Sequence, residues 1–326
     1  MTTPTVRKVW FSSRASTQDA REGGRPSRFR WGRGLEISAF LAPALIVYLL
    51  FVLVPIVLAA YYSFYKWSGL GPLNNFVNLD NYRRALNDDV FQNAIWHNAL
   101  IVVLSLAVQF PLTLGLSLLL NRRMRGRAVL RLVLFAPYVL SEVITAVIWL
   151  LMLQPDGLVD HAFSAVGLGH LVQLWLADKH LVLYTMLVVL TWKYLGFGIV
   201  LFLAGLQGIP QELTEAAAID GASGFKVVRH VTVPLLGPTI RIWAFLSIIG
   251  SLQVFDLIWI MTGGGPGNAS NTMVTYLISR GFGRYAFGYG SAVAVILFII
   301  SFVVALTYQR FVLRRDTEGA LTRMVG

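Results

Sequence analysis

Residues 215–234, EAAAIDGASGFKVVRHVTVP, form the longest polar and charged piece of the chain that lies between two strongly apolar segments. Overlapping its start, Gln211–Ile219 is rich in alanine and carries glutamate in its first turns, and both features favour a helix there. Gly221 predicts the end of that helix, because glycine readily adopts the left-handed conformation common after helix C-termini. The first half of the stretch is therefore expected to be a short helix followed by a tight turn.

The second half of the stretch, residues 222–231, is compatible with another helix. Lys226 and Arg229 lie toward its C-terminal end, where positive charge is favoured. Pro234 and Pro238 are expected to stop this helix before the next apolar run, since proline lacks a backbone N–H. On local structure alone, a solvated connector explains such a helix–turn–helix loop equally well.

The order of residues in the loop gives a more specific signal. Glu215-Ala216-Ala217 is followed by three residues and Gly221, and then by nine residues and Val231-x-Val233-Pro234. This pattern resembles the EAA loop of membrane permease subunits of binding-protein-dependent ABC importers, as does the run Asp220-Gly221-Ala222. The family usually has Ile and Leu where Val231 and Val233 stand here, a departure that keeps an apolar contact. The resemblance implies that a loop at residues 209–238 couples the chain to a separate ATPase through Glu215, Ala216, Ala217, Asp220, Gly221 and Pro234.

The composition of the chain indicates a membrane protein. Of 326 residues, 56% are hydrophobic and only 13% are charged, whereas about a quarter of a typical soluble domain is charged. The absence of cysteine excludes disulfides and thiol chemistry, and the five histidines are scattered, so no metal site is expected. The net charge of +11 does not indicate nucleic acid, because the basic residues lie at the edges of apolar segments.

Six segments are apolar and long enough to cross a bilayer core, which needs about 20 residues per helix. They lie roughly at residues 36–65, 94–120, 129–153, 182–208, 240–261 and 291–312. We therefore predict an all-α polytopic membrane protein, and the resemblance implies the six-transmembrane-helix fold of type I ABC importer permeases. The permease domain is expected at residues 35–312. A basic, disordered cytoplasmic tail is expected at residues 1–34 and a second cytoplasmic tail at residues 313–326.

The loops between these segments alternate in charge. Basic residues concentrate in both tails, at residues 121–131 and in the EAA-like loop. Of the other three connections, residues 66–93 are mixed, residues 154–181 are net acidic, and residues 262–290 carry only Arg280 and Arg284. Basic loops remain in the cytoplasm. With an even number of spans, both termini are then expected on the cytoplasmic side of a bacterial inner membrane.

Three charged side chains lie within the expected spans: Glu142, Lys193 and Asp256. Charged groups at membrane depth are costly and usually face a bundle interior or a water-filled path. We expect Lys193 to pair with Glu142 or Asp256. Gln253 is expected to share a helix face with Asp256, because the two residues are three apart.

Aromatic side chains accompany these groups, with Tyr138 close to Glu142 and Trp192 beside Lys193. Sugars suit such surroundings, because their C–H faces stack on aromatic rings while their hydroxyls need hydrogen-bond partners. The hypothesis is a translocation path for a hydroxyl-rich solute, formed by Tyr138, Glu142, Trp192, Lys193, Gln253 and Asp256. The alternative is that the charged groups form structural pairs only.

The glycine run Gly263-Gly264-Gly265-Pro266-Gly267 is expected to be a tight turn, since it lacks the phosphate-binding pattern GxxxxGK[ST]. Together with Phe255-Asp256, Ser270-Asn271-Thr272 and residues 287–292, it resembles the corresponding stretch of carbohydrate permeases of the maltose and glycerol-phosphate type. The resemblance covers residues 35–312. It implies sugar import, with a di- or oligosaccharide favoured.

The expected partners follow from the resemblance and from the absence of a Walker A sequence. Without that sequence the chain is not expected to hydrolyse ATP or to be an enzyme. It is expected to carry no cofactor, with ATP and Mg²⁺ bound by a cytoplasmic ATPase dimer. A second homologous permease and an extracellular or periplasmic sugar-binding protein are also implied, in a lipid bilayer and without nucleic acid.

Two other classes of membrane protein remain open. An ion-coupled secondary transporter could use Glu142, Lys193 and Asp256 as coupling groups, but it would leave the EAA-like loop unexplained. A membrane enzyme should show clustered carboxylates or histidines near one membrane face, and the sequence contains no such cluster.

Overall fold

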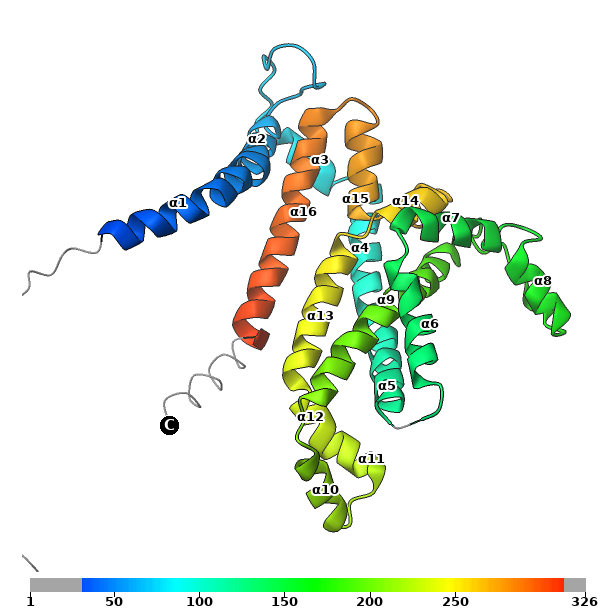
Figure 1. Ribbon diagram of the computed structural model, residues 1–326. Coiled ribbons are helices and arrows are strands. Elements are labelled where there is room, and N and C mark those ends of the chain that lie inside the picture. The colour runs from blue at the N-terminus through cyan, green and yellow to red at the C-terminus, as the bar shows by residue number, and fades with distance from the viewer. Residues whose placement is uncertain (1–30, 123, 314–326) are drawn as a thin grey trace, which may run out of the picture. The chain divides into compact units, whose positions relative to one another are not determined.

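The computed structural model describes residues 31–122 and 124–313, and this part of the chain is helical (Figure 1). Most of the two expected tails, residues 1–34 and 313–326, lies outside the described residues. The chain divides into two compact units, Met1–Val54 and Pro55–Gly326. The described part of the first unit is α1 (Trp31–Tyr48), which continues into a π-helical turn at Leu49–Leu53. Helix thus begins a few residues before the expected position 35, because no proline separates Trp31 from the apolar run.

The remaining helices follow a simple order along the chain. They are α2 (Val54–Tyr62), α3 (Asp80–Leu86), α4 (Asp89–Leu104), α5 (Phe110–Asn121), α6 (Arg127–Val139), α7 (Glu142–Leu153), α8 (Leu158–Ala165), α9 (Val182–Gln207), α10 (Gln211–Ile219), α11 (Gly224–Val227), α12 (Val233–Leu235), α13 (Gly237–Leu252), α14 (Asp256–Thr262), α15 (Met273–Tyr276) and α16 (Phe287–Tyr308). Further π-helical turns lie at Ser105–Gln109, Val228–Thr232, Leu277–Phe282 and Gln309–Leu313, and a 3₁₀ turn at Gly169–Leu171. An isolated antiparallel bridge joins Tyr65 and Phe76.

Four helical runs in the described residues are long and apolar enough to cross a membrane. They are Ile37–Tyr62, Asp89–Asn121, Val182–Gln207 and Phe287–Leu313. Two bent pairs also qualify if each counts as one span: Arg127–Val139 with Glu142–Leu153, bent by 101°, and Gly224–Leu235 with Gly237–Leu252, bent by 69°. The described part of the chain is therefore all-helical, with four to six candidate membrane spans.

Three of the π-helical turns are each followed by a proline at the same distance. Leu49–Leu53 precedes Pro55, Ser105–Gln109 precedes Pro111, and Val228–Thr232 precedes Pro234, in each case two residues after the turn ends. Proline cannot donate a backbone hydrogen bond, and its ring collides with the carbonyl of the preceding turn. A widened π-helical turn relieves that collision, so the chain stays helical through these prolines.

The second helix of the EAA-like loop ends before the next apolar run, as expected, but Pro234 does not stop it. That helix begins at Gly224, passes through the turn Val228–Thr232 and ends at Leu235 in α12, so Pro234 lies within it. Pro238 is the second residue of α13, where its missing N–H would have had no partner in the helix.

Two of the expected spans are interrupted. The third, at residues 129–153, breaks at Leu140 and Ser141, and the Ser141 side chain caps α7 by accepting from the Ile144 backbone N–H. The fifth, at residues 240–261, breaks after Leu252, and a new helix begins at Asp256. Apolar composition alone does not show such breaks, because the residues on both sides remain hydrophobic.

The second unit is built around α9, which packs against both α5 and α6. Gly196 brings the α6 backbone close, since a Cβ at this position would lie 2.4 Å from the Leu134 carbonyl oxygen. The core forms three clusters, around α7, α9 and α14, around α3, α4, α15 and α16, and around α5 and α9. These contacts fix the walls of the cavity described next.

Candidate functional site: a cavity between helix breaks and a polar loop

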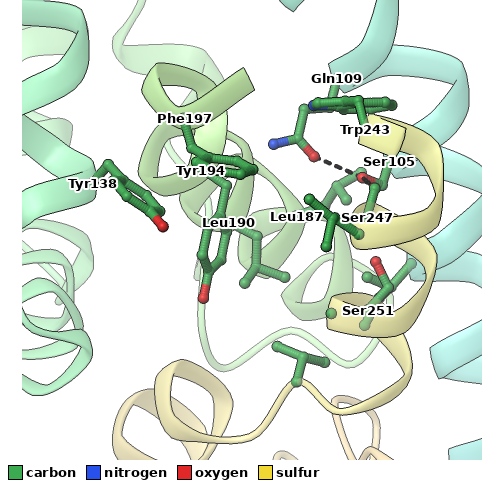
Figure 2. A pocket seen from close by; sticks show the side chains of 14 residues that line it. Ser105, Gln109, Tyr138, Leu187, Leu190, Tyr194, Phe197, Trp243, Ser247 and Ser251 are labelled. Atoms are coloured by element: carbon green, nitrogen blue, oxygen red, sulfur yellow. Dashed lines mark hydrogen bonds between the residues drawn. The ribbon is translucent and has the colours of Figure 1, made fainter. Parts of the chain in front are cut away.

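A cavity of about 300 Å³ lies within the second unit, between α6, α9, α13 and the junction of α4 and α5 (Figure 2). Its lining residues are Ile101, Ser105, Gln109, Tyr138, Leu187, Leu190, Tyr194, Phe197, Trp243, Leu246, Ser247, Gly250, Ser251 and Val254. The size falls at the lower end of the range of small-molecule sites.

One wall of the cavity carries a short chain of hydrogen bonds. The Ser105 hydroxyl donates to Gln109 Oε1 at 2.6 Å, and the Ser105 and Ser247 hydroxyls are 2.7 Å apart. The amide nitrogen of Gln109 points away from Ser105 and toward the middle of the cavity (Figure 2). Since an amide nitrogen can only donate, Gln109 presents a donor to any molecule in the cavity.

Aromatic rings form much of the remaining lining. Tyr138 stacks on Phe197 with ring centroids 5.2 Å apart and meets Tyr194 edge-on at 6.4 Å. Trp243 lies on the other side of the cavity, beside Gln109 (Figure 2). Aromatic faces opposite hydroxyl and amide groups can bind a molecule that has both C–H faces and hydroxyls.

Helical spacing explains why these residues meet. Trp243, Ser247 and Ser251 are four residues apart on α13, and Ser105 and Gln109 are four apart in their π-helical turn. Residues spaced by three or four share one face of a helix. These positions were not predicted from the sequence, because only charged residues within the spans and their polar and aromatic neighbours were singled out. A search for small polar residues at this spacing within apolar spans would have found them.

The break between α6 and α7 is closed by Lys193 of α9. Only 1% of Lys193 is exposed. Its ammonium group donates to the carbonyls of Pro137 at 3.1 Å and Tyr138 at 3.2 Å, and also to that of Leu140. These carbonyls lie at the C-terminal end of α6, where backbone carbonyls lack an N–H donor from the helix itself. Positive charge is also favoured at this end of a helix.

Glu142 balances this buried charge. Its Oε1 lies 3.7 Å from Lys193 Nζ, and Tyr194 Oη donates to the same oxygen at 3.0 Å. The expected pairing of Lys193 with Glu142 is thus confirmed. Glu142 is also the first residue of α7, where the N-terminal end of the helix favours a negative charge.

The break between α13 and α14 is closed by uncharged groups. The Asn98 amide donates to the carbonyls of Ser251 at 2.7 Å and Leu252 at 3.3 Å, and its Oδ1 accepts from the Met273 N–H at 2.8 Å. The Thr272 hydroxyl donates to the Val254 carbonyl at 3.0 Å. Residues far apart in sequence thus hold the end of α13 beside the cavity.

The six residues proposed for the translocation path do not all meet. Tyr138 lines the cavity, and Glu142 and Lys193 lie at the break beside it. Trp192 packs against Trp149 instead, with ring centroids 5.4 Å apart. Gln253 and Asp256 do not share a helix face, because α13 ends at Leu252, just before Gln253, and α14 begins at Asp256. Both are exposed and neither lines the cavity.

The EAA-like loop begins with α10, whose bounds, Gln211–Ile219, are those expected. The helix ends in a Schellman motif, in which the Ala222 N–H donates to the Ala217 carbonyl and the Gly221 N–H to the Ala218 carbonyl. Gly221 has φ +81°, a conformation that favours glycine. Glu215 accepts from Gln211 Nε2 at 2.6 Å and is exposed.

The surface of this loop is open and partly apolar. Glu215, Ala216, Asp220, Gly221 and Pro234 are all exposed, and Ala217 is half-buried. Apolar side chains accompany them, with Ile219 86% and Phe225 74% exposed. Figure 1 shows α10, α11 and α12 at the end of the second unit where α5 connects to α6. The loop therefore offers a surface with apolar side chains and charges of both signs at one end of the unit.

Neither the cavity nor the EAA-like loop presents the arrangement of residues expected of a catalytic centre. The cavity is lined by apolar, hydroxyl and amide groups and has no carboxylate or imidazole in its wall. In the described part of the chain, no group of three or more His, Cys, Asp and Glu side chains is placed to hold a metal ion. The arrangement is suited to reversible binding of an uncharged polar molecule.

Residues 109–317 match the family described as "Binding-protein-dependent transport system inner membrane component". The chain belongs to this family. It is therefore a multi-pass membrane permease subunit of an ABC importer, a transport component and not an enzyme. As a member of a binding-protein-dependent system, it works with a solute-binding protein and with the other parts of an ABC transporter.

Curated relatives and solved structures agree with this assignment. The chain is 35% identical to the trehalose/maltose transport system permease protein MalF of Thermococcus litoralis over 85% of this chain and 93% of the relative. It is 31% identical to the diacetylchitobiose uptake system permease protein NgcF of Streptomyces coelicolor over 93% and 89%. A chain of a bacterial alginate ABC importer has the same fold, with a TM-score of 0.77, 22% identity and coverage of 88% of this chain and 99% of that one.

Proposed function

We propose that this permease imports a di- or oligosaccharide, and that the cavity beside the two helix breaks is where the sugar is held during transport. The observation that carries the proposal is the lining, in which Tyr138, Tyr194 and Trp243 offer aromatic faces while Gln109 and Ser247 offer hydrogen bonds. Such a lining matches both surfaces of a sugar.

The relatives support the choice of substrate class. Trehalose, maltose and diacetylchitobiose appear in the names of the two curated relatives, and all three are disaccharides. A cavity of about 300 Å³ can hold part of such a sugar within this chain, and a partner chain would complete the site.

The proposed complex has two permeases and two ATPases. A second, homologous permease stands beside this chain, and a cytoplasmic ATPase dimer binds ATP and Mg²⁺. We place the ATPase contact on α10 and the turn after it, at Glu215, Ala216, Ala217, Asp220, Gly221 and Pro234. Exposed Ile219 and Phe225 support this contact, because an apolar surface at the end of a membrane helix bundle favours a protein partner.

The proposed orientation places the coupling loop and both termini in the cytoplasm. It is supported by the connection between α5 and α6, which contains Arg122 and Arg125 and lies at the same end of the unit as α10 (Figure 1). The sugar-binding protein then docks at the opposite end, near α7, α14 and α15.

The test is sugar uptake by the complete complex in proteoliposomes, with radiolabelled maltose, trehalose and diacetylchitobiose as probes and ATP inside. The informative variants are Gln109→Leu, in the cavity, and Gln253→Leu, outside it. We expect Gln109→Leu to lower uptake about tenfold, because a buried donor to the sugar is lost. We expect Gln253→Leu to have little effect.

The opposite result, with Gln253→Leu impaired and Gln109→Leu unchanged, would favour the path expected from the sequence, which includes Gln253, over the cavity. ATP-independent uptake driven by an ion gradient would favour the secondary transporter instead. Loss of ATPase activity in the Glu215→Arg complex, with the complex still able to bind its sugar-binding protein, would support the coupling surface.

A further inference from the structure

One face of α7 carries three buried polar atoms that have no hydrogen-bond partner within the described part of the chain. They are Glu142 Oε2, Thr145 Oγ1 and Trp149 Nε1. The residues follow one another at intervals of three and four, so the three side chains form a single stripe along the helix. Thr145 is completely buried.

The two ends of the stripe contact aromatic side chains of α9. Trp149 meets Trp192 edge-on with ring centroids 5.4 Å apart, and Glu142 accepts the hydroxyl of Tyr194 at 3.0 Å. The opposite face of α7 carries only exposed apolar residues, among them Val143, Val147 and Leu151. The polar atoms are therefore turned inward, away from the side expected to face lipid.

Leaving such groups buried without partners is costly. An unpaired hydroxyl or indole N–H in an apolar interior costs on the order of 1–3 kcal/mol, and native proteins contain few of them. A valine would fill the same space as Thr145 without this cost, and an aromatic ring without an N–H would avoid it at position 149. Three such atoms in one stripe therefore suggest another conformation of the protein, in which they have hydrogen-bond partners.

We propose that this face of α7, with the neighbouring rings of α9, is the outer part of the sugar path. It is closed in the present conformation, and when α7 and α9 separate its polar atoms form hydrogen bonds with the sugar hydroxyls. The inference rests on the proposed function and extends it to a second contact surface. The two surfaces are continuous, because Tyr194 lines the cavity and also holds Glu142. Together Thr145, Trp149 and Trp192 repeat the pairing of polar atoms and aromatic faces found in the cavity.

The experiment uses two variants that remove the unpartnered donors of the stripe. Thr145→Val is near-isosteric and removes only the hydroxyl, whereas Trp149→Phe removes the indole N–H together with part of the ring. Each is measured in the complete complex for its thermal unfolding midpoint and for uptake of whichever of maltose, trehalose and diacetylchitobiose the wild type transports. We expect the midpoint of Thr145→Val to stay or rise, because an unsatisfied group is removed, and that of Trp149→Phe to fall, because the smaller ring leaves a cavity. We expect uptake to fall about three- to tenfold in both, because a hydrogen bond to the sugar is lost.

The matched control is Ser301→Ala on α16, which removes a buried and unpartnered hydroxyl outside the stripe. We expect its midpoint to behave like that of Thr145→Val and its uptake to remain at the wild-type rate. Unchanged uptake in Thr145→Val and Trp149→Phe would overturn the proposal. A lowered midpoint of Thr145→Val with a proportionate loss of uptake would also overturn it, since the hydroxyl would then serve stability only.

A second measurement uses the absence of cysteine from the chain. Thr145→Cys places a thiol at a position that is closed at rest, and its modification by a small thiol reagent can be read from the mass of this chain. We expect modification to speed up at least tenfold when ATP, sugar and binding protein are all present, because α7 and α9 then separate. A thiol that stays protected during turnover would contradict the proposal for α7 even if sugar uptake is normal. This outcome therefore distinguishes failure of the α7 proposal from failure of the proposed function.

Discussion

At the end of α6 the backbone carbonyls accept hydrogen bonds from a buried ammonium group, Lys193, whereas at the end of α13 they accept from an amide, Asn98, and a hydroxyl, Thr272. Both interruptions border the same cavity. The first needs a counter-charge, which Glu142 supplies at 3.7 Å. The second is electrically neutral and needs none.

The difference shows two ways of stabilising a broken helix in an apolar environment. A charge can satisfy three carbonyls at once but must itself be compensated. Neutral groups avoid that requirement but must be supplied from several helices, and here they come from α4 and from the residue before α15. The neutral break consequently ties more of the fold together, and the charged break depends more on a single side chain.

The largest effect is expected from Lys193→Met, which leaves three carbonyls and the Glu142 carboxylate without their partner. Removing one member of a buried ion pair costs about 3–5 kcal/mol. We expect a lower thermal unfolding midpoint and a lower yield of the purified complex. The double variant Lys193→Met with Glu142→Gln should recover part of the loss, and the absence of any recovery would show that Glu142 does not balance the charge.

Asn98→Leu tests the neutral break and is expected to have the next largest effect. The variant leaves the Ser251 carbonyl and the Met273 N–H unpaired in the interior, a loss on the order of 2–3 kcal/mol in thermal or denaturant unfolding. Asn93→Leu on the exposed side of the same helix is the control and should be close to wild type. Equal effects of the two variants would contradict the role given to Asn98.

Thr272→Val removes one hydroxyl from the same break. Thr272 donates to the Val254 carbonyl and also caps α15 through the Thr275 N–H. Single hydrogen bonds between membrane helices contribute about 0.6 kcal/mol on average, so with the cap we expect a loss of about 1 kcal/mol in the unfolding free energy. A loss as large as that of Asn98→Leu would mean that Thr272, and not Asn98, is the main support of this break.

The smallest effect is expected at the Gly221 turn of the EAA-like loop, where backbone hydrogen bonds within the loop itself close the end of α10. Gly221→Ala introduces no collision, since a Cβ there meets nothing within 4 Å, but φ +81° strains alanine by about 1 kcal/mol. Gly224→Ala lies in α11 without a positive φ and serves as the control. We expect Gly221→Ala alone to lower sugar-stimulated ATPase activity, and similar behaviour of the two variants would show that the turn geometry is unimportant.

Much of the fold could be predicted from the sequence because the responsible interactions are local. Alanine content and a following glycine fixed the bounds of α10 and its Schellman turn, and apolar length located five of the candidate spans to within several residues. The fifth, expected at residues 240–261, corresponds instead to the bent pair Gly224–Leu235 and Gly237–Leu252. The helix breaks could not be predicted in this way. They depend on Lys193, Asn98 and Thr272, whose partners lie more than 50, 150 and about 20 residues away respectively.

Of the two parts of the candidate site, one could be predicted from the sequence and the other could not. The loop of Glu215, Gly221 and Pro234 could be found from its spacing, because it is one continuous segment. The cavity could not, since Gln109, Tyr194 and Ser247 come from three separate helices and none of them is charged. Gln253 and Asp256 were misplaced for a related reason, because a spacing of three implies a shared face only where the helix is continuous.

By itself, then, the sequence determined a membrane-spanning helical chain with an EAA-like loop, since hydrophobic length, glycine conformation and motif spacing act over short distances. Only the tertiary structure decided where the helices break, that Lys193 is held by α6 and Glu142, and which uncharged side chains face a common cavity. Those features require hydrogen bonds between helices, and a buried polar group can be satisfied by any partner that the packing brings within reach.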